Sequence, residues 1–569
     1  MNTIIVENAK AAALFAQATD SNALGFRQYR GNRFIITWTD GIPLNKEVTV
    51  RDKGDVHIQL SDEQSSWLAV IKIAEASSDR IYVATDSRDT AFWLLSFMPL
   101  HEIHDKVIRI HIREMTVKGV RESFNNIESP GHFLQNIKSE LFRRRHDGIL
   151  RSATDSLITK SCGTATYKLG RIRTPLLSMI ALRFKEWHEI MPKAEYRVHL
   201  VMEHQGRTFR FTSDSSWNTP AETNAAYIRL KRAEERALIT HVSCRLRTEK
   251  APKLFNMSTL MRTANERHSL TIEQIAASTR RLYEWGLITY PFTNADSISI
   301  RKVRKIHRLL EFLHDHNTLG ASASRIEMLS TGSLKRCPCR GHHGIMITGM
   351  KLGPIALRMN YADKVIYNLI CTRMVEAFSP ASLVQTITAG AMAAGISFSL
   401  SESYIQQRGW KSVEDKSLRK EEPIERELLW PTNSKVGYNA VSITKRVVKP
   451  DKPYSEGELL CLAHGMKLGT SHEIADALKE LIEEGYVYRS EDGLKPTEKG
   501  SALYAIVKGQ PIADIDMMAT LERYIRKYRT DDIPDDPHHP FQLDVYDTAV
   551  SELAGSSMLF PNKPQNTLK

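Results

Sequence analysis

The amino-acid sequence predicts a mixed α/β protein that is divided into three or four compact domains. Its 569 residues exceed what a single hydrophobic core normally supports. Short apolar strands alternate with helical patterns near the N-terminus, and strand-like and helix-like segments follow one another through the rest of the chain. This order of elements predicts an α/β domain followed by separate β-rich and helical domains.

The N-terminal segment is predicted to form an α/β sheet whose strands end in acidic residues. The expected strands cover residues 3–6, 33–37 and 81–85, and the expected helices cover residues 9–18 and 61–77. Glu7 follows the first strand and Asp86 follows the last. In such sheets the binding site lies at the carboxyl edge, where two carboxylates suit Mg²⁺. Two solvated acids are the alternative interpretation.

The segments after this domain are assigned by their periodicity. We expect helices over residues 146–190 and 257–325, and strands over residues 196–245 and 380–450. Residues 455–510 predict a winged-helix-like unit of two helices and a hairpin, with Thr470 and Glu473 forming a capping box. The segment after residue 530 is rich in Asp and Pro, and we expect it to be loosely ordered.

One tyrosine stands in a setting that favours chemistry. An amphipathic helical pattern leads to Gly286, and a short apolar strand then ends at Tyr290, directly before a proline and a polar turn. At such a corner the phenol is expected to be exposed, as a nucleophilic tyrosine would be. A strand end with a solvated hydroxyl is the alternative.

Composition limits the classes of partner. The net charge is +12, although the segment after Thr530 is acidic, so the preceding body is more basic still. A basic body suits a polyanion such as nucleic acid. The chain shows no signal peptide and no apolar stretch of membrane-spanning length, and six cysteines are too few for a disulfide framework. We therefore expect a cytoplasmic protein without a membrane partner, associated with the nucleoid if it is prokaryotic.

The segment around the tyrosine resembles the nucleophile motif of type IA DNA topoisomerases. Tyr283, Glu284 and the run from Gly286 to Pro291 match that motif, as does Thr293. Phe292 stands where the family has an arginine, and Asn294 where it has an aspartate. The resemblance implies that Tyr290 is the nucleophile.

The N-terminal segment resembles the Toprim domain of the same family, and this resemblance implies a metal site. Glu7 matches the family's first acid and would be both a catalytic residue and a metal ligand, with Asp86 and, less securely, Asp89 as further Mg²⁺ ligands. Asn8 replaces the family's lysine, so Lys10 and Arg88 are candidates to replace lost phosphate contacts.

Further motifs occur in the family's order as far as residue 500. His342 matches a histidine that lies near the scissile phosphate, which implies a phosphate-contacting or proton-transfer role. A zinc site that combines His342 with Cys337 and Cys339 is disfavoured, because their spacing lacks a second half. The matching DNA-binding positions are Arg171, Arg173, Thr174 and Thr470. Ile474 stands where the family has another arginine.

The resemblance implies a toroid of four domains. A Toprim domain would span residues 1–145, and a helical domain carrying Tyr290 would span residues 256–374. The other expected segments are a winged-helix-like domain (residues 146–195 and 440–530), a β-rich arch (residues 196–255 and 375–439) and an acidic tail (residues 531–569). No Cys₄ zinc ribbons follow the core.

The resemblance also implies an activity. A type IA enzyme cleaves one strand of single-stranded or negatively supercoiled DNA through a 5′-phosphotyrosine, passes a strand and reseals the break without ATP. Because the departures fall on charge-handling positions, a catalytically weak or inactive relative that binds single-stranded DNA stays open as the alternative. A different Toprim nuclease or primase is disfavoured, since it would give Tyr290 no role. The compact size and divergence favour a mobile element or a phage as the source.

Overall fold

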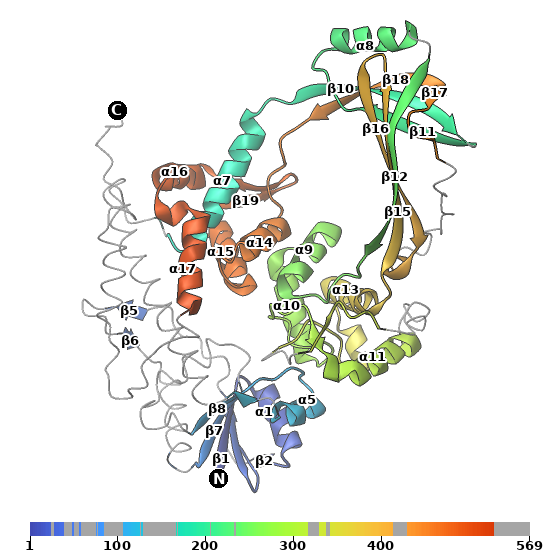
Figure 1. Cartoon of the computed structure of the whole chain (residues 1–569). Coiled ribbons are helices and arrows are strands. Elements are labelled where there is room, and N and C mark those ends of the chain that lie inside the picture. Colours follow the sequence, from blue (N-terminus) through green and yellow to red (C-terminus); the bar gives the residue numbers. More distant parts are fainter. Residues whose placement is uncertain are drawn as a thin grey trace, which may run out of the picture.

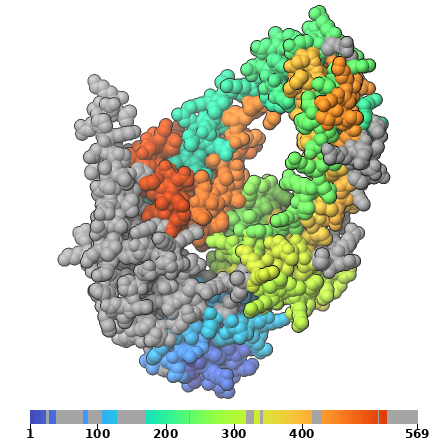
Figure 2. All heavy atoms as spheres, in the orientation of Figure 1, coloured from blue at the N-terminus to red at the C-terminus, as the bar shows by residue number. Residues whose placement is uncertain are grey.

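The computed structural model describes most of the chain in separate ranges. These are residues 1–23, 28–38, 48–50, 56–58, 76, 78–84, 106–125, 127–128, 167, 169–204, 206–232, 235–316, 329–336, 342–413 and 429–527. Four units follow from the sheets and from helix packing, and together they form a ring with a visible opening (Figures 1 and 2). In the part of the chain that is described, no helix is both long and apolar enough to cross a membrane.

The N-terminal unit is a seven-stranded sheet, and its described residues include two helices packed together. Its strand order is β2-β3-β4-β1-β7-β8-β9, and neighbouring strands from β4 to β8 run parallel. The elements are β1 (Asn2–Val6), α1 (Ala9–Ala18), β2 (Asn22–Ala23), β3 (Gln28–Arg30), β4 (Phe34–Trp38), β7 (Arg80–Ala84), β8 (Val107–Ile110), α5 (Val117–Ser123) and β9 (Ile127–Glu128). A separate pair of strands is β5 (Val48–Val50) and β6 (Val56–Ile58). The predicted strands at residues 3–6, 33–37 and 81–85 and the helix at residues 9–18 are confirmed within one or two residues. The helix expected at residues 61–77 lies outside the described residues except for residue 76.

The upper part of the ring is a second seven-stranded sheet, in which all pairings are antiparallel. The order is β17-β12-β15-β16-β11-β10-β18. The elements are β10 (Lys193–His204), β11 (Arg207–Ser213), α8 (Pro220–Arg232), β12 (Arg236–Glu249), β15 (Ser382–Ala393), β16 (Ile396–Gln407), η3 (Gly409–Ser412), β17 (Lys435–Gly437) and β18 (Ala440–Val448). Its core is separate from that of the other units. β18 pairs with β10 along its whole length, so it belongs to this sheet. The predicted start of the winged-helix-like segment at residue 440 was therefore wrong.

In the part of the chain that is described, the helical unit contains four main helices, which are joined by short strands and 3₁₀ turns. The elements are α9 (Met257–His268), α10 (Ile272–Glu284), β13 (Ile298–Ser299), η1 (Ile300–Lys302), α11 (Val303–His316), β14 (Leu334–Lys335), η2 (Gly353–Leu357) and α13 (Tyr361–Phe378). Capping boxes at Asn256, Thr271 and Asn360 start three of the four helices. α13 continues to Phe378, so the predicted domain boundary at residue 374 falls inside a helix and was too early.

The last unit combines segments from both sides of the β-rich sheet. Its elements are α7 (Arg173–Glu189), α14 (Glu456–Gly465), α15 (Ser471–Glu483), β19 (Val487–Ser490), β20 (Gly493–Pro496), α16 (Glu498–Val507), η5 (Pro511–Ala513) and α17 (Ile515–Lys527). α7 packs against α15, α16 and β20. The predicted capping box is present, since the Thr470 hydroxyl accepts from the Glu473 amide and the Glu473 carboxylate accepts from the Thr470 amide. The helix, helix and hairpin order expected for residues 455–510 is confirmed.

Candidate active site

The segment that carries Tyr290 crosses from the helical unit to the N-terminal unit. Its amide donates to the carbonyl of Arg113 at 2.9 Å, just beyond β8. On the other side the Thr289 amide donates to the carbonyl of Met346 at 2.8 Å, and Ile288 forms a single antiparallel bridge with Ile347. The predicted strand at this place is thus a single bridge rather than a continuous strand. These bonds place the tyrosine between two segments of the chain that are remote in sequence.

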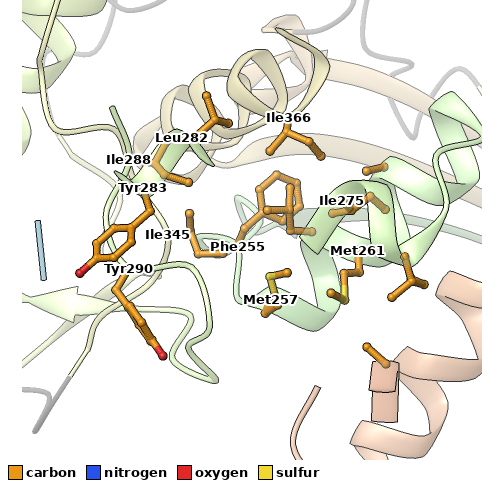
Figure 3. Close-up of a cluster of buried hydrophobic side chains, with 14 of the residues drawn as sticks. Phe255, Met257, Met261, Ile275, Leu282, Tyr283, Ile288, Tyr290, Ile345 and Ile366 are labelled. Atoms are coloured by element: carbon orange, nitrogen blue, oxygen red, sulfur yellow. The ribbon is translucent and has the colours of Figure 1, made fainter. Parts of the chain in front are cut away.

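The aromatic ring of Tyr290 is buried among other rings. The residue is 9% exposed and lies at the margin of the apolar cluster of the helical unit (Figure 3). Its ring stacks on His342 with centroids 3.9 Å apart, and it meets the edge of Tyr283 at 5.5 Å. The hydroxyl of Tyr283 donates to the carbonyl of Ile112 at 3.1 Å. The expectation of a presented phenol was therefore wrong for this state, because the N-terminal unit covers the corner that the sequence would leave open.

His342 is a neutral imidazole in this arrangement. Desolvation is the largest cause that lowers its pKa well below 6.5, and the charges of His111, Arg109 and Arg113 lower it further. The side chain keeps some accessible surface, whereas its Nδ1 is enclosed and has no hydrogen-bond partner among the described residues. A neutral imidazole stacked on a phenol is able to accept a proton or a hydrogen bond.

The neighbouring His343 has a different setting. It is 7% exposed, and its Nδ1 lies 2.8 Å from the carbonyl of Gly344. Burial lowers its pKa to about 3, although the hydrogen bond to Gly344 opposes that shift. His343 therefore fits a packed, neutral histidine. Of the two adjacent histidines, His342 is the one that lies against Tyr290.

The extended segment after β8 brings basic side chains to this junction. Arg109, His111 and Arg113 alternate with Ile110 and Ile112, both of which are buried. The ring of His111 meets the ring of His342 edge-on at 5.5 Å. The sequence analysis did not single out these three residues. Their spacing of two along an apolar segment was the signal that could have found them.

Of the residues predicted to form the acidic corner, Glu7 and Lys10 are described. Glu7 directly follows β1, whose last residue Val6 pairs with Ala84, the last residue of β7. The strand ends expected to carry the metal ligands are therefore neighbours. Asp86, Arg88 and Asp89 lie outside the described residues, and within the described part of the chain no group of three or more metal-ligating side chains occurs.

Asn8 has a clear structural role at the position where the resemblance expects a lysine. Its side chain accepts a hydrogen bond from the Ala11 amide at 2.9 Å and so caps α1. Lys10 is exposed on the first turn of this helix. Partial desolvation lowers the pKa of its ammonium group, against the attraction of Glu284. Lys10 therefore faces the helix that leads to Tyr290.

The two arginines at the start of α7 that were predicted to bind DNA form ion pairs with glutamates of the protein itself. The guanidinium of Arg171 is 4% exposed and donates to Glu522 at 2.7 Å and to Glu473 at 3.4 Å. Arg173 pairs with Glu480 and with Glu484. These contacts fix α7 against α15 and α17. A role of Arg171 and Arg173 in DNA binding stays a prediction that no contact in this state tests.

The other predicted binding positions serve helix ends or the core. Thr174 is buried, and its hydroxyl accepts from the Gly170 amide at 3.0 Å. Thr470 is the N-cap of α15. Ile474, at the position of a family arginine, is fully buried in the same helix. Cys337 and Cys339 lie outside the described residues, so a zinc site there stays untested.

The comparisons with known proteins agree with one another. A family model described as DNA topoisomerase matches residues 134–534. DNA topoisomerase 3 of Bacillus subtilis is 22% identical over 89% of this chain and 75% of its own length. DNA topoisomerase 1 of Methanocaldococcus jannaschii is 24% identical over 85% of this chain and 63% of its own length.

A solved structure shows the same fold. The full-length topoisomerase I of Thermotoga maritima superposes with a TM-score of 0.73 at 16% identity, covering 99% of this chain and 91% of that chain. The fold and the junction around Tyr290 thus define a toroidal protein of topoisomerase architecture. Because the family model matches well over half of its residues, the chain belongs to the DNA topoisomerase family, of the type IA class. The predicted fold class and family are confirmed.

Proposed function

We propose that this type IA topoisomerase cleaves one DNA strand with Tyr290 as its nucleophile. The observation that carries the proposal is the junction at which Tyr290 stacks on His342 and its amide binds the carbonyl of Arg113. Three segments meet there, and two of them supply basic or titratable side chains. DNA is the substrate that the family implies, and a preference for single-stranded or negatively supercoiled DNA is part of the proposal.

The chemistry of the step follows from these groups. The phenolic oxygen of Tyr290 attacks the phosphorus, forming a phosphotyrosine bond at the 5′ end of the strand downstream of the break. The bond from phosphorus to the 3′ oxygen breaks, that oxygen takes up a proton, and the phenol loses its own. The neutral imidazole of His342 is suited to accept a proton or to contact the phosphate. Resealing runs the same exchange backwards, so no ATP is needed.

Access to Tyr290 requires a change of state. The ring is 9% exposed, and its amide is held by the N-terminal unit. A DNA strand therefore reaches the hydroxyl only after the N-terminal unit and the helical unit separate at this junction. The opening visible in Figure 2 lies above the helical unit.

Magnesium is part of the proposal. The donor set is carboxylate oxygen, which suits Mg²⁺, and Glu7 stands beside the strand that leads to Asp86. Glu7 and Asp86, with Asp89, would hold the ion, which would supply charge neutralisation at the phosphate. Next to Glu7, Asn8 caps α1, and the ammonium group of Lys10 is attracted by Glu284.

The test is covalent trapping of a labelled single-stranded oligonucleotide with Mg²⁺, alongside relaxation of negatively supercoiled plasmid. Wild type is expected to give a protein–DNA adduct, which Tyr290→Phe abolishes without changing binding. Tyr361→Phe, an exposed tyrosine on α13, is the matched control and is expected to keep the adduct. Tyr283→Phe tests the adjacent phenol. An adduct that persists in Tyr290→Phe and disappears in Tyr283→Phe would reassign the nucleophile.

The alternative function is single-strand binding with little or no cleavage. It is favoured by Phe292, Asn8 and Ile474, three uncharged residues at positions where the resemblance expects cations. Tight binding of the oligonucleotide together with no adduct and no relaxation from wild type would support this alternative.

A further inference from the structure

Strand cleavage builds negative charge on the phosphoryl oxygens, and a cation beside the nucleophile stabilises that charge. Two residues after Tyr290 the chain carries Phe292, whose side chain has no charge. A cation at this place would therefore have to come from another segment of the chain.

Arg280 is such a cation. It lies on α10, and its guanidinium carbon lies 5.6 Å from the centroid of the Phe292 ring, within the range of a cation–π contact. The Phe292 ring is in turn 5.9 Å from the ring of Tyr290. A single aromatic ring thus separates the Arg280 guanidinium from the nucleophile.

The next residue along α10 shows how differently the two arginines are used. Arg281 donates to the buried carboxylate of Asp363 at 2.7 Å and to Ser278 at 3.0 Å. The ion pair with Asp363 holds α10 against α13. Arg280 is exposed, and among the described residues no carboxylate lies within 4 Å of it. Its guanidinium keeps its donors available for an anion.

A histidine also lies beside Phe292. The ring of His472, on the first turn of α15, lies 5.4 Å from the Phe292 ring, and its Nε2 lies 3.4 Å from the Asp476 carboxylate. Arg109 and Arg113 act from a different segment, where their charges lower the pKa of His342. Arg280 is therefore the exposed arginine on the Phe292 side of the nucleophile.

We propose that Arg280 binds the scissile phosphate beside Tyr290, and that Phe292 is a positioning residue that holds its guanidinium there. The cation that the family supplies from the position of Phe292 would in this chain come from the preceding helix. The catalytic part of the inference rests on the proposed function, whereas the phosphate contact does not.

The first experiment measures that contact without chemistry. In a Tyr290→Phe background, binding of a single-stranded oligonucleotide is followed by fluorescence anisotropy over a series of salt concentrations. Arg280→Ala is expected to reduce the slope of log affinity against log salt by about 0.7, the value for one neutralised phosphate on a single strand. Arg229→Ala removes the same charge from an exposed site on α8, at the far end of the ring (Figure 1), and is expected to leave the slope unchanged. An unchanged slope in Arg280→Ala would overturn the proposal.

The second experiment measures catalysis with Tyr290 intact. Arg280→Ala is expected to slow adduct formation by roughly 10²–10³-fold, with an unchanged melting temperature. Adding Phe292→Arg to Arg280→Ala is expected to restore most of the rate, because it returns a guanidinium to the same place. A folded double variant that stays as slow as Arg280→Ala would contradict the proposal. If wild type forms no adduct, the cleavage proposal fails, and the salt slope still decides whether Arg280 contacts phosphate.

Discussion

The guanidinium of Arg171 donates to the carboxylate of Glu522 at 2.7 Å, although 351 residues separate the two in the sequence. The exposed fractions of the two side chains are 4% and 0%. This ion pair joins the first residues before α7 to the last helix that the structure describes. The unit they belong to is therefore closed by a contact between its two ends.

Removing one partner of this pair is expected to destabilise the last unit. Glu522→Ala leaves a buried guanidinium without its nearest carboxylate, and the expected loss is about 3–5 kcal/mol of unfolding free energy. Replacing both residues, with Arg171→Met and Glu522→Leu, is expected to cost less, since no buried charge is left behind. Thermal and urea unfolding check this, with Glu498→Ala at an exposed site on α16 as the control. Equal stability of Glu522→Ala and Glu498→Ala would show that the pair contributes little.

The two buried histidines predict a loss of stability in acid. Burial lowers the pKa of His343 to about 3 and that of His342 well below 6.5. The unfolded chain therefore takes up protons first, so this contribution to stability is complete above about pH 6.5. For His343 it falls by about 1.4 kcal/mol per pH unit as the pH decreases toward 3. The lowered pKa of His342 adds a loss in the same direction.

Denaturant unfolding at pH 7, 6 and 5 measures that slope. His343→Gln is expected to flatten it by the share of one histidine. A slope that is the same in wild type and His343→Gln would show that His343 titrates normally.

The same pKa shift bears on the pH dependence of cleavage. Because the pKa of His342 is lowered well below 6.5, its own titration is expected to leave no inflection near pH 6.5 when the rate of adduct formation is followed from pH 6 to 8. Rates measured across this range on the labelled oligonucleotide check the expectation. A drop centred near pH 6.5 that disappears in His342→Gln would show that the DNA-bound state restores an ordinary pKa.

Substituting two glycines that share one backbone angle distinguishes the cost of backbone strain from the cost of steric crowding. Gly286 and Gly485 each have φ +74°, which disfavours any other residue. A Cβ on Gly286 would lie 2.8 Å from the carbonyl oxygen of Met115, whereas a Cβ on Gly485 would meet nothing within 4 Å. Gly485→Ala is expected to cost about 1 kcal/mol, and Gly286→Ala clearly more. Gly286→Ala is also expected to weaken the junction at Tyr290. Melting temperatures of the two variants check this, and equal losses would contradict the role of the Met115 contact.

Much of the architecture could be predicted from the sequence, because local signals coincide with the fold. The strand at residues 3–6, the helix at residues 9–18 and the capping box at Thr470 each depend on short-range patterns. The assignment of β18 was wrong because pairing with β10 joins residues about 250 positions apart, which no local pattern reports. The boundary at residue 374 was misplaced although Pro380, shortly after Phe378, is a signal that the helix ends there.

The candidate site was predicted less completely, for a related reason. Tyr290 and His342 were found by motif, and the structure brings their rings together. The burial of Tyr290 was not foreseen, because the covering segment at Arg113 comes from another unit. Arg280 was not singled out, because one exposed arginine on a helix carries no signal until the fold places it on Phe292.

The β-rich sheet meets its neighbours through paired chain segments at both ends. β10 and β18 lead to α7 and α14 at one end, and β12 and β15 lead to α9 and α13 at the other (Figure 1). Each attachment therefore consists of two chain segments rather than one. By contrast, the contacts between α9 and α14 among the described residues are side-chain packing and hydrogen bonds such as that from the Gly457 amide to the Asn265 side chain at 2.9 Å. We therefore expect the ring to open at the contact between α9 and α14 and at the Tyr290 junction. The two-segment attachments of the β-rich sheet would keep the separated units aligned, so that the ring can close again.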